Sequence, residues 1–155
     1  MRIWQTIDAA LIARLNKAVQ QVHADLYPEL FKPYSFADMQ AAFEEYLRDE
    51  SSFFFVVAKD ETSRPVGYVW VQLRSVAPNV FRRGYKTAHA HQLSVVEPEH
   101  RRGFGSALME YVTTFASETG CVQVELDYWV ENTPAAAFYE RIGYKPKRII
   151  VQKPL

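Results

Sequence analysis

The stretch EHRRGFGSALMEYV, residues 99–112, decides the fold, because it joins a predicted strand to a predicted helix through a loop with two arginines and two glycines. The backbone N–H groups at a helix N-terminus face outward and suit a phosphate group. Gly103 and Gly105 let the backbone turn sharply and admit an anion without a Cβ in the way. On the loop alone, two interpretations stay open: an ordinary helix start with a solvated arginine pair, or a phosphate cradle. Neither a third glycine at dinucleotide-binding spacing nor a Gly-Lys-Ser/Thr triplet is present.

Hydrophobic periodicity predicts alternating strands and helices on both sides of this loop. The predicted strands are a short one around residues 3–6, then 53–59, 66–73, 88–96, 122–130 and an extended segment 144–153. The predicted helices are one capped by Asp8, one starting at Ser35 or Asp38, one over 103–118 ended by Gly120, and one over 132–142 capped by Asn132. Strands in hairpins, followed by strand–helix–strand–helix, are typical of a mixed sheet in an α/β (α+β) domain. We expect residues 1–155 to form a single domain, since no repeat or linker interrupts them.

Composition excludes several classes of protein. The 155 residues are 48% hydrophobic and 23% charged, as in globular proteins rather than disordered ones. Lysine plus arginine equals aspartate plus glutamate at 18 each, which argues against a nucleic-acid partner. No apolar run approaches the roughly 20 residues that span a bilayer, so no membrane partner is expected. One cysteine and the absence of a signal-peptide pattern predict a cytoplasmic protein.

Two separated segments carry a family resemblance. HQLSVVEPEHRRGFGSAL, residues 91–108, resembles the acyl-CoA signature of the GNAT superfamily of N-acyltransferases, a strand followed by Q/R-x-x-G-x-G/A and a helix. NTPAAAFYERIGY, residues 132–144, is similar to the family's second signature, N-x-x-A-x-x-x-Y-x-x-x-G-F/Y. The resemblance implies a mixed, mostly antiparallel sheet of six to seven strands with about four helices and a splay between the fourth and fifth strands. Two features depart from the family: His100 replaces the usual Gln or Arg, and little chain follows Gly143.

The resemblance also implies the co-substrate, acetyl-CoA, and the residues that hold it. The backbone of the loop would bind the CoA pyrophosphate, and the strand before it would offer backbone groups to the pantetheine arm. Asn132 would contact the pantetheine, although a helix cap alone also explains this residue. The implied CoA-binding residues are Leu93, Ser94, Val95, Arg101, Arg102, Gly103, Phe104, Gly105, Ser106, Asn132 and Tyr139.

Amine attack on a thioester requires a base for the ammonium and an acid for the leaving thiolate. Tyr139 lies seven residues after Asn132, about two helical turns, and is the candidate acid. His89 and His91 fall on one face of a strand, and family members related to serotonin N-acetyltransferase carry a similar H-x-H-x-L-x-V pattern. We therefore predict His91, then His89, as the base, with simple packing of both rings as the open alternative. Glu125 and Asp127 are backup bases.

The sequence thus predicts an enzyme, an N-acetyltransferase that moves an acetyl group from acetyl-CoA to a primary amine of a small molecule or peptide. A non-catalytic CoA-binding sensor and a nucleotide-binding protein are the alternatives. No metal site is expected, because no Cys, Asp or Glu constellation joins the histidines. The short tail predicts either a sheet that ends early or a homodimer in which a second copy completes it.

Overall fold

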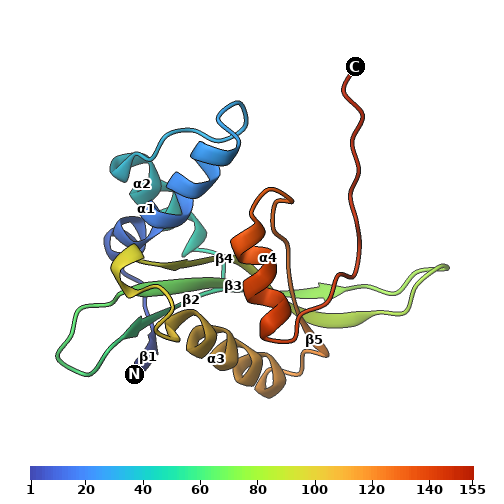
Figure 1. The fold of residues 1–155 in the computed structure, drawn as a ribbon. Coiled ribbons are helices and arrows are strands. Elements are labelled where there is room, and N and C mark those ends of the chain that lie inside the picture. The colour runs from blue at the N-terminus through green and yellow to red at the C-terminus, as the bar shows by residue number, and fades with distance from the viewer.

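The computed structural model describes residues 1–155, which form one five-stranded sheet with helices on both faces (Figure 1). The strands are β1 (Arg2–Gln5), β2 (Ser52–Ala58), β3 (Gly67–Val76), β4 (Tyr85–Val95) and β5 (Gln123–Leu126). The helices are α1 (Ala9–Leu26), α2 (Phe36–Tyr46), the short 3-10 helix η1 (Glu97–Glu99), α3 (Phe104–Glu118) and α4 (Thr133–Arg141). No helix has the length and apolar character needed to cross a membrane.

The sheet is mixed and mostly antiparallel, as predicted, but it has fewer strands than expected. Its order is β1-β2-β3-β4-β5, with antiparallel pairing up to β4 and a parallel pairing of β4 with β5. The expectation of six to seven strands is wrong, because residues 142–155 form no strand and add no backbone pairing to the sheet. The strand predicted over 122–130 ends at Leu126, and Trp129 is 40% exposed rather than buried in a strand.

Alternation along β2 divides the core between the two faces of the sheet. Phe55 and Val57 pack toward α3, whereas Phe54 and Val56 pack toward α1 and α2. The partly buried apolar side chains of α4 join the α3 layer, which places both family-like segments on one side of the sheet.

Three helices begin with the side-chain caps that the sequence predicts. Asp8 accepts from the N–H of Leu11 at 2.9 Å, and Ser35, not Asp38, caps α2. Asn132 accepts from the N–H of Ala135 at 3.3 Å and so starts α4. These caps satisfy backbone donors that have no acceptor within the helix.

The sheet opens between β4 and β5, which confirms the predicted splay. β5 pairs with β4 only over Thr87–Ala90, while β4 continues to Val95 without a partner on that side. The β3–β4 register also shifts, since Trp70 pairs with Gln92 but Val71 pairs with Ala90. His91 is therefore the extra residue of a β-bulge, which locally increases the twist of β4 where the two strands part.

Candidate functional site

The loop between η1 and α3 presents a row of free backbone donors. Arg101 has φ of 60° and Gly103 has φ of 85°, so the loop turns twice through the left-handed region before α3 begins. The N–H groups of Arg101, Arg102 and Gly103 donate to no protein acceptor. Those of Phe104–Ser106 lie in the first helical turn, where no intrahelical acceptor exists. Six consecutive amides, backed by the dipole of α3, thus form a site suited to a phosphate anion.

The charges around this loop are not equivalent. Arg102 pairs with Glu99 at 2.9 Å, and Lys59 pairs with the other oxygen of the same carboxylate at 2.6 Å. The hydrogen bond from Lys59 is the main reason that the pKa of Glu99 lies below its usual value. Arg101 makes no ion pair and is the freely available positive charge of the loop.

His100, the residue that departs from the family pattern, has a structural role. Its Nε2 lies 2.7 Å from the carbonyl oxygen of Val95, the last residue of β4. The ring therefore holds the loop against the end of the strand. No sequence signal identified this contact, because it depends on the turn made by η1.

The two loop glycines differ in what they permit. Gly103 adopts a left-handed conformation, and a Cβ there would meet only Met1 at 3.7 Å. A Cβ on Gly105 would lie 3.3 Å from the ring of Phe138, so this glycine also lets α4 approach α3 closely.

The open edge of β4 runs from the loop toward the splay. The carbonyl of Val95 accepts a hydrogen bond from His100 and therefore faces away from β3. Backbone groups of successive strand residues point to opposite sides, so those of Leu93, two residues earlier, also face away from β3. By the same alternation the backbone groups of Ser94 point toward β3. Its side chain is also engaged, because the buried hydroxyl donates to the carbonyl of Leu15 in α1 at 2.7 Å. Of the three strand residues expected to bind CoA, Leu93 and Val95 thus have backbone groups at the opening, whereas Ser94 does not.

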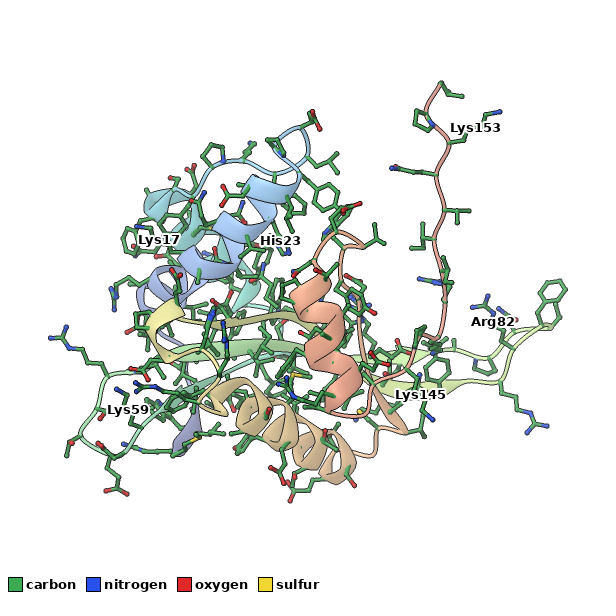
Figure 2. All side chains as sticks on the ribbon, in the orientation of Figure 1. Lys17, His23, Lys59, Arg82, Lys145 and Lys153 are labelled. Atoms are coloured by element: carbon green, nitrogen blue, oxygen red, sulfur yellow. The ribbon has the colours of Figure 1, made fainter.

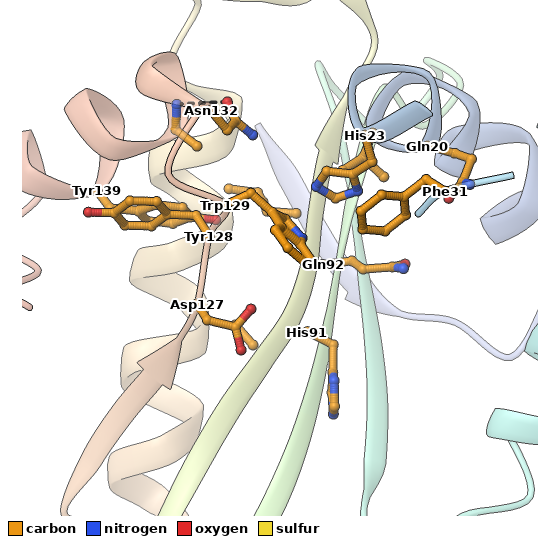
Figure 3. Close-up of a pocket in the computed structure, with 14 residues that line it drawn as sticks. Gln20, His23, Phe31, His91, Gln92, Asp127, Tyr128, Trp129, Asn132 and Tyr139 are labelled. Carbon is orange, nitrogen blue, oxygen red and sulfur yellow. Dashed lines mark hydrogen bonds between the residues drawn. The ribbon is translucent and has the colours of Figure 1, made fainter. Parts of the chain in front are cut away.

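A cavity of about 220 Å³ lies beside this opening (Figure 3). It brings together His91, Leu93, Asn132 and Tyr139, which the sequence placed in two separate segments. Another part of the wall comes from α1 and the chain that follows it, and sequence reasoning missed these residues. They are Val19, Gln20, His23 and Phe31.

Aromatic rings build that wall. Phe31 stacks on His23 with centroids 4.8 Å apart and meets the edge of Trp129 at 5.4 Å. Tyr27 packs against Trp129 at 4.9 Å, and its hydroxyl accepts from the N–H of Glu131 at 3.1 Å. These contacts tie the segment after α1 to the segment after β5. Burial lowers the pKa of His23, so its ring is neutral near pH 7.

His91 is a half-buried, neutral imidazole held by its neighbours. Its ring stacks on Trp70 with centroids 4.2 Å apart, and its Nε2 lies 3.0 Å from Gln72 Oε1 and 3.3 Å from Arg74. Burial, then the proximity of His89 and Arg74, lowers the pKa of His91 to about 4. The ring is therefore uncharged at neutral pH but is a weak proton acceptor.

His89 lies 4.8 Å from His91 between ring centroids, which confirms that both rings share one face. Its Nε2 is 3.8 Å from Asp127 Oδ2, while its Nδ1 is buried without a hydrogen-bond partner. Burial lowers the pKa of His89, and the nearby Asp127 and Glu125 oppose that shift. Glu125 itself pairs with Lys147, whereas the carboxylate of Asp127 is exposed and is the only one that lines the cavity.

Tyr139 lies among aromatic rings at the cavity wall. Its ring centroid is 5.1 Å from that of Phe138, 5.7 Å from Tyr144 and 6.0 Å from Tyr128. Burial raises its pKa well above the usual value for tyrosine, so the phenol keeps its proton through neutral pH. The hydroxyl makes no hydrogen bond within the protein and remains available as a donor. No group of three or more His, Cys, Asp or Glu side chains is arranged to hold a metal ion.

Comparison with known proteins agrees with this geometry. Residues 17–144 match the acetyltransferase (GNAT) family. The chain belongs to that family. The match covers both segments on which the resemblance rested, and so confirms it.

Two curated relatives carry acetyltransferase names. The uncharacterized N-acetyltransferase MJ1207 of Methanocaldococcus jannaschii is 34% identical over 104 residues, which cover 66% of this chain and 43% of that protein. The N-alpha-acetyltransferase of Saccharolobus solfataricus is 26% identical over 115 residues, or 70% of this chain and 65% of that one. The chain thus matches less than two thirds of the length of either relative.

Solved structures share the fold. The tetramutant of the BH1408 protein from Bacillus halodurans superposes with a TM-score of 0.92 over 100% of both chains, at 23% identity. AAC(6')-Iy, in complex with the bisubstrate analog CoA-S-monomethyl-acetylneamine, has a TM-score of 0.69 at 17% identity, over 99% of this chain and 97% of that one.

Proposed function

We propose that this GNAT protein transfers an acetyl group from acetyl-CoA directly to a primary amine. The observation that carries the proposal is the row of six free amides from Arg101 to Ser106, beside the open edge of β4 and the cavity beyond it. A pyrophosphate on those amides would direct an extended thioester arm along β4 toward the cavity. The name of the Methanocaldococcus relative and the CoA-containing ligand of AAC(6')-Iy support the same reaction class.

Backbone groups and one side chain would hold the co-substrate. The amides of the loop would bind the pyrophosphate, with Arg101 as the free positive charge. The backbone of Leu93 and Val95 would pair with the pantetheine arm as an added strand. The side-chain NH₂ of Asn132, whose oxygen is already used as a cap, would donate to the arm near its thioester end.

Direct transfer requires two protons to leave the nitrogen and one to reach the sulfur. The attacking amine is protonated near pH 7, and its proton would pass to a histidine, either directly or through water. The geometry favours His89 over His91, because Asp127 lies beside His89, whereas the weakly basic His91 is engaged with Gln72 and Arg74. The amine nitrogen bonds to the thioester carbon, and as the C–S bond then breaks the nitrogen gives up its second proton to water. Tyr139 would protonate the leaving thiolate and recover a proton from water. A free N–H of β4 would stabilise the oxyanion.

The residues that line the cavity indicate which kind of acceptor amine could bind there. Asp127 is its one carboxylate, no lysine or arginine lines it, and its far wall is aromatic. This combination supports, as the acceptor, an amine with a single positive charge and a compact apolar body, either a small molecule or the end of a peptide. A polycation would need further carboxylates, which the cavity does not offer.

Tyr139→Phe tests the proposal, because the change removes only the phenolic oxygen. We expect unchanged affinity for CoA and a loss of roughly 100-fold or more in amine-dependent thiol release, within the range for a general acid. Tyr144→Phe is the matched control, since it removes a hydroxyl from the same aromatic cluster, and its rate is expected to stay within a few-fold of the parent.

Other outcomes separate the alternatives. Equal rates for Tyr139→Phe and the parent would remove Tyr139 from the mechanism. CoA binding without thiol release for any amine in a broad panel would identify a non-catalytic CoA sensor. Thermal stabilisation by ATP but not by CoA would identify a nucleotide-binding protein.

A further inference from the structure

Two glutamines face the cavity from different elements of the fold. Gln92 lies on β4 immediately after the bulge, and Gln20 lies on α1 (Figure 3). Both line the cavity, and neither takes part in the proposed proton transfers. A glutamine amide has a donor at one end and an acceptor at the other. Its hydrogen bonds within the protein therefore decide which end is left for a ligand.

A buried polar network holds the amide of Gln92. Tyr68 and Asn16 are both fully buried. The Tyr68 hydroxyl lies 2.6 Å from Gln92 Oε1, a separation that is typical of O–H···O bonds and shorter than N–H···O bonds. The side-chain NH₂ of Asn16 donates to the Tyr68 hydroxyl at 3.0 Å and to Gln92 Oε1 at 3.3 Å. The oxygen of Gln92 thus faces the network.

The NH₂ group of Gln92 is left free. It makes no hydrogen bond within the protein. The only buried side-chain atoms without a partner are Asn16 Oδ1 and His89 Nδ1, so the Gln92 Nε2 atom is open to the cavity. This wall of the cavity therefore has one hydrogen-bond donor whose direction the network fixes.

Gln20 is held in the opposite sense. Its Nε2 donates to the carbonyl oxygen of Lys32 at 2.7 Å, and a carbonyl oxygen can only accept. Its Oε1 accepts no hydrogen bond from the protein and is not fully buried. Gln20 follows Asn16 by one helical turn on the same face of α1, so it lies beside the network that holds Gln92. The same wall thus offers a fixed donor and a fixed acceptor.

This pair of groups matches a neutral amide. The carbonyl of an amide can accept from Gln92, and its N–H can donate to Gln20. A carboxylate would require a cation, but no lysine or arginine lines the cavity. Figure 2 shows Lys59 and Arg82 at opposite edges of the molecule, both away from His23 in the cavity wall. His23 is itself uncharged near neutral pH, because burial lowers its pKa.

We infer that the acceptor carries an amide beside its primary amine, as in an amino-acid amide or the first peptide bond of a chain, and that Gln92 and Gln20 bind this amide. Tyr68 and Asn16 are positioning residues, because they fix which end of Gln92 faces the ligand. The ammonium would then lie toward Asp127, which Figure 3 shows on the other side of the cavity. The inference rests on the proposed function, since it names the acceptor of that same site.

Steady-state kinetics with matched amines is the first test. Leucinamide has both amide groups, and leucine methyl ester keeps the carbonyl but lacks the N–H. The two amines have similar basicity. One neutral hydrogen bond corresponds to about 2- to 10-fold in kcat/KM. We expect leucinamide to exceed the ester by that factor, through Gln20. An equal or higher kcat/KM for the ester would overturn the inference.

Two variants of Gln92 test the donor. Gln92→Leu removes the amide, whereas Gln92→Glu keeps the oxygen that Tyr68 and Asn16 bind and removes only the NH₂. Each is expected to lower kcat/KM for leucinamide by about 2- to 10-fold more than for isoamylamine, which is leucinamide without its amide. Comparing variant with parent cancels the different basicities of the two amines. Thermal melting verifies that both variants fold.

Gln21→Leu is the matched control for these variants. It makes the same change one position from Gln20, in an exposed side chain whose amide bonds to Asp25. Its ratio of leucinamide to isoamylamine is expected to equal that of the parent. If the Gln92 variants lose activity equally with both amines, or lose more with the amino alcohol leucinol than with leucinamide, the inference is overturned.

Side-chain NMR keeps this inference separate from the proposed function. In ¹⁵N-labelled protein with CoA present, the NH₂ signals of Gln92 are identified by their loss in Gln92→Leu. We expect leucinamide to shift these signals more than isoamylamine does. If no amine is acetylated but leucinamide still shifts them, the proposed function fails and the amide site stands. If amines are acetylated but leucinamide leaves the signals unshifted, the proposed function stands and the amide site is overturned.

Discussion

Replacing Gly103 with alanine tests whether the conformation of the loop, and not its composition, makes the anion site. Gly103 has φ of 85° and ψ of −1°, and a Cβ there would make only an ordinary contact with Met1 at 3.7 Å. The effect of Gly103→Ala is therefore conformational. A left-handed alanine costs about 1–2 kcal/mol. For a chain of this length, such a loss lowers Tm by about 2–8 °C.

If the loop relaxes to relieve that strain, its amides turn away from the anion. Loss of one hydrogen bond to a charged group costs about 1.5–3 kcal/mol. The Kd for CoA is then expected to rise by roughly 10- to 100-fold. Gly120→Ala provides the matched control, because Gly120 has φ of 78°, has nothing within 4 Å of the place that a Cβ would take, and lies at the far end of α3.

Thermal melting and calorimetric titration with CoA measure the two effects separately. Both variants are expected to lose similar stability, but only Gly103→Ala is expected to lose affinity for CoA. Equal CoA affinity in the two variants would refute the assignment of the loop amides to the pyrophosphate.

Three further predictions follow from single contacts. Asn132→Ala removes the cap of α4 and is expected to lower the free energy of unfolding by about 1 kcal/mol, measured by urea denaturation; an unchanged midpoint would contradict the cap. The pKa of His91 is about 4 in the folded protein and 6.5 for a free ring. As pH is lowered, the unfolded chain therefore takes up the proton before the folded protein does. The free energy of unfolding falls as pH drops from 6.5 toward 4. With a discount for the partial exposure of His91, we expect this ring to account for about 1–2 kcal/mol of the loss in unfolding free energy, and His91→Gln to remove that contribution. Equal dependence of stability on pH in the variant and the parent would contradict this prediction. His100→Ala removes the 2.7 Å contact with Val95 and is expected to raise the Kd for CoA by about 2- to 10-fold, and unchanged titration would contradict that role.

Local patterns predicted the parts of the site that depend on neighbouring residues. The alternation of His89 and His91, the cap at Asn132 and the glycines around Phe104 each follow from spacing within one element, and the structure has them as expected. The splay followed from the family resemblance alone.

Contacts between distant elements were not predictable in the same way. The packing of Phe31 against Trp129 joins residues almost a hundred positions apart, and nothing in either segment marks the other as a neighbour. His100 depends on the turn of η1, and the bulge at His91 depends on the register of β3. The strand count of six to seven came from the family resemblance and was too high. The β-rich composition of Ile149–Val151 does not itself provide a pairing partner.

The most direct test of the central claim is amide chemical-shift mapping of the ¹⁵N-labelled protein during titration with acetyl-CoA. We predict that the largest shifts occur at the six amides from Arg101 to Ser106, together with Leu93 and Val95 on the open edge of β4. Saturable binding of acetyl-CoA that leaves these amides unshifted would show that the co-substrate binds elsewhere.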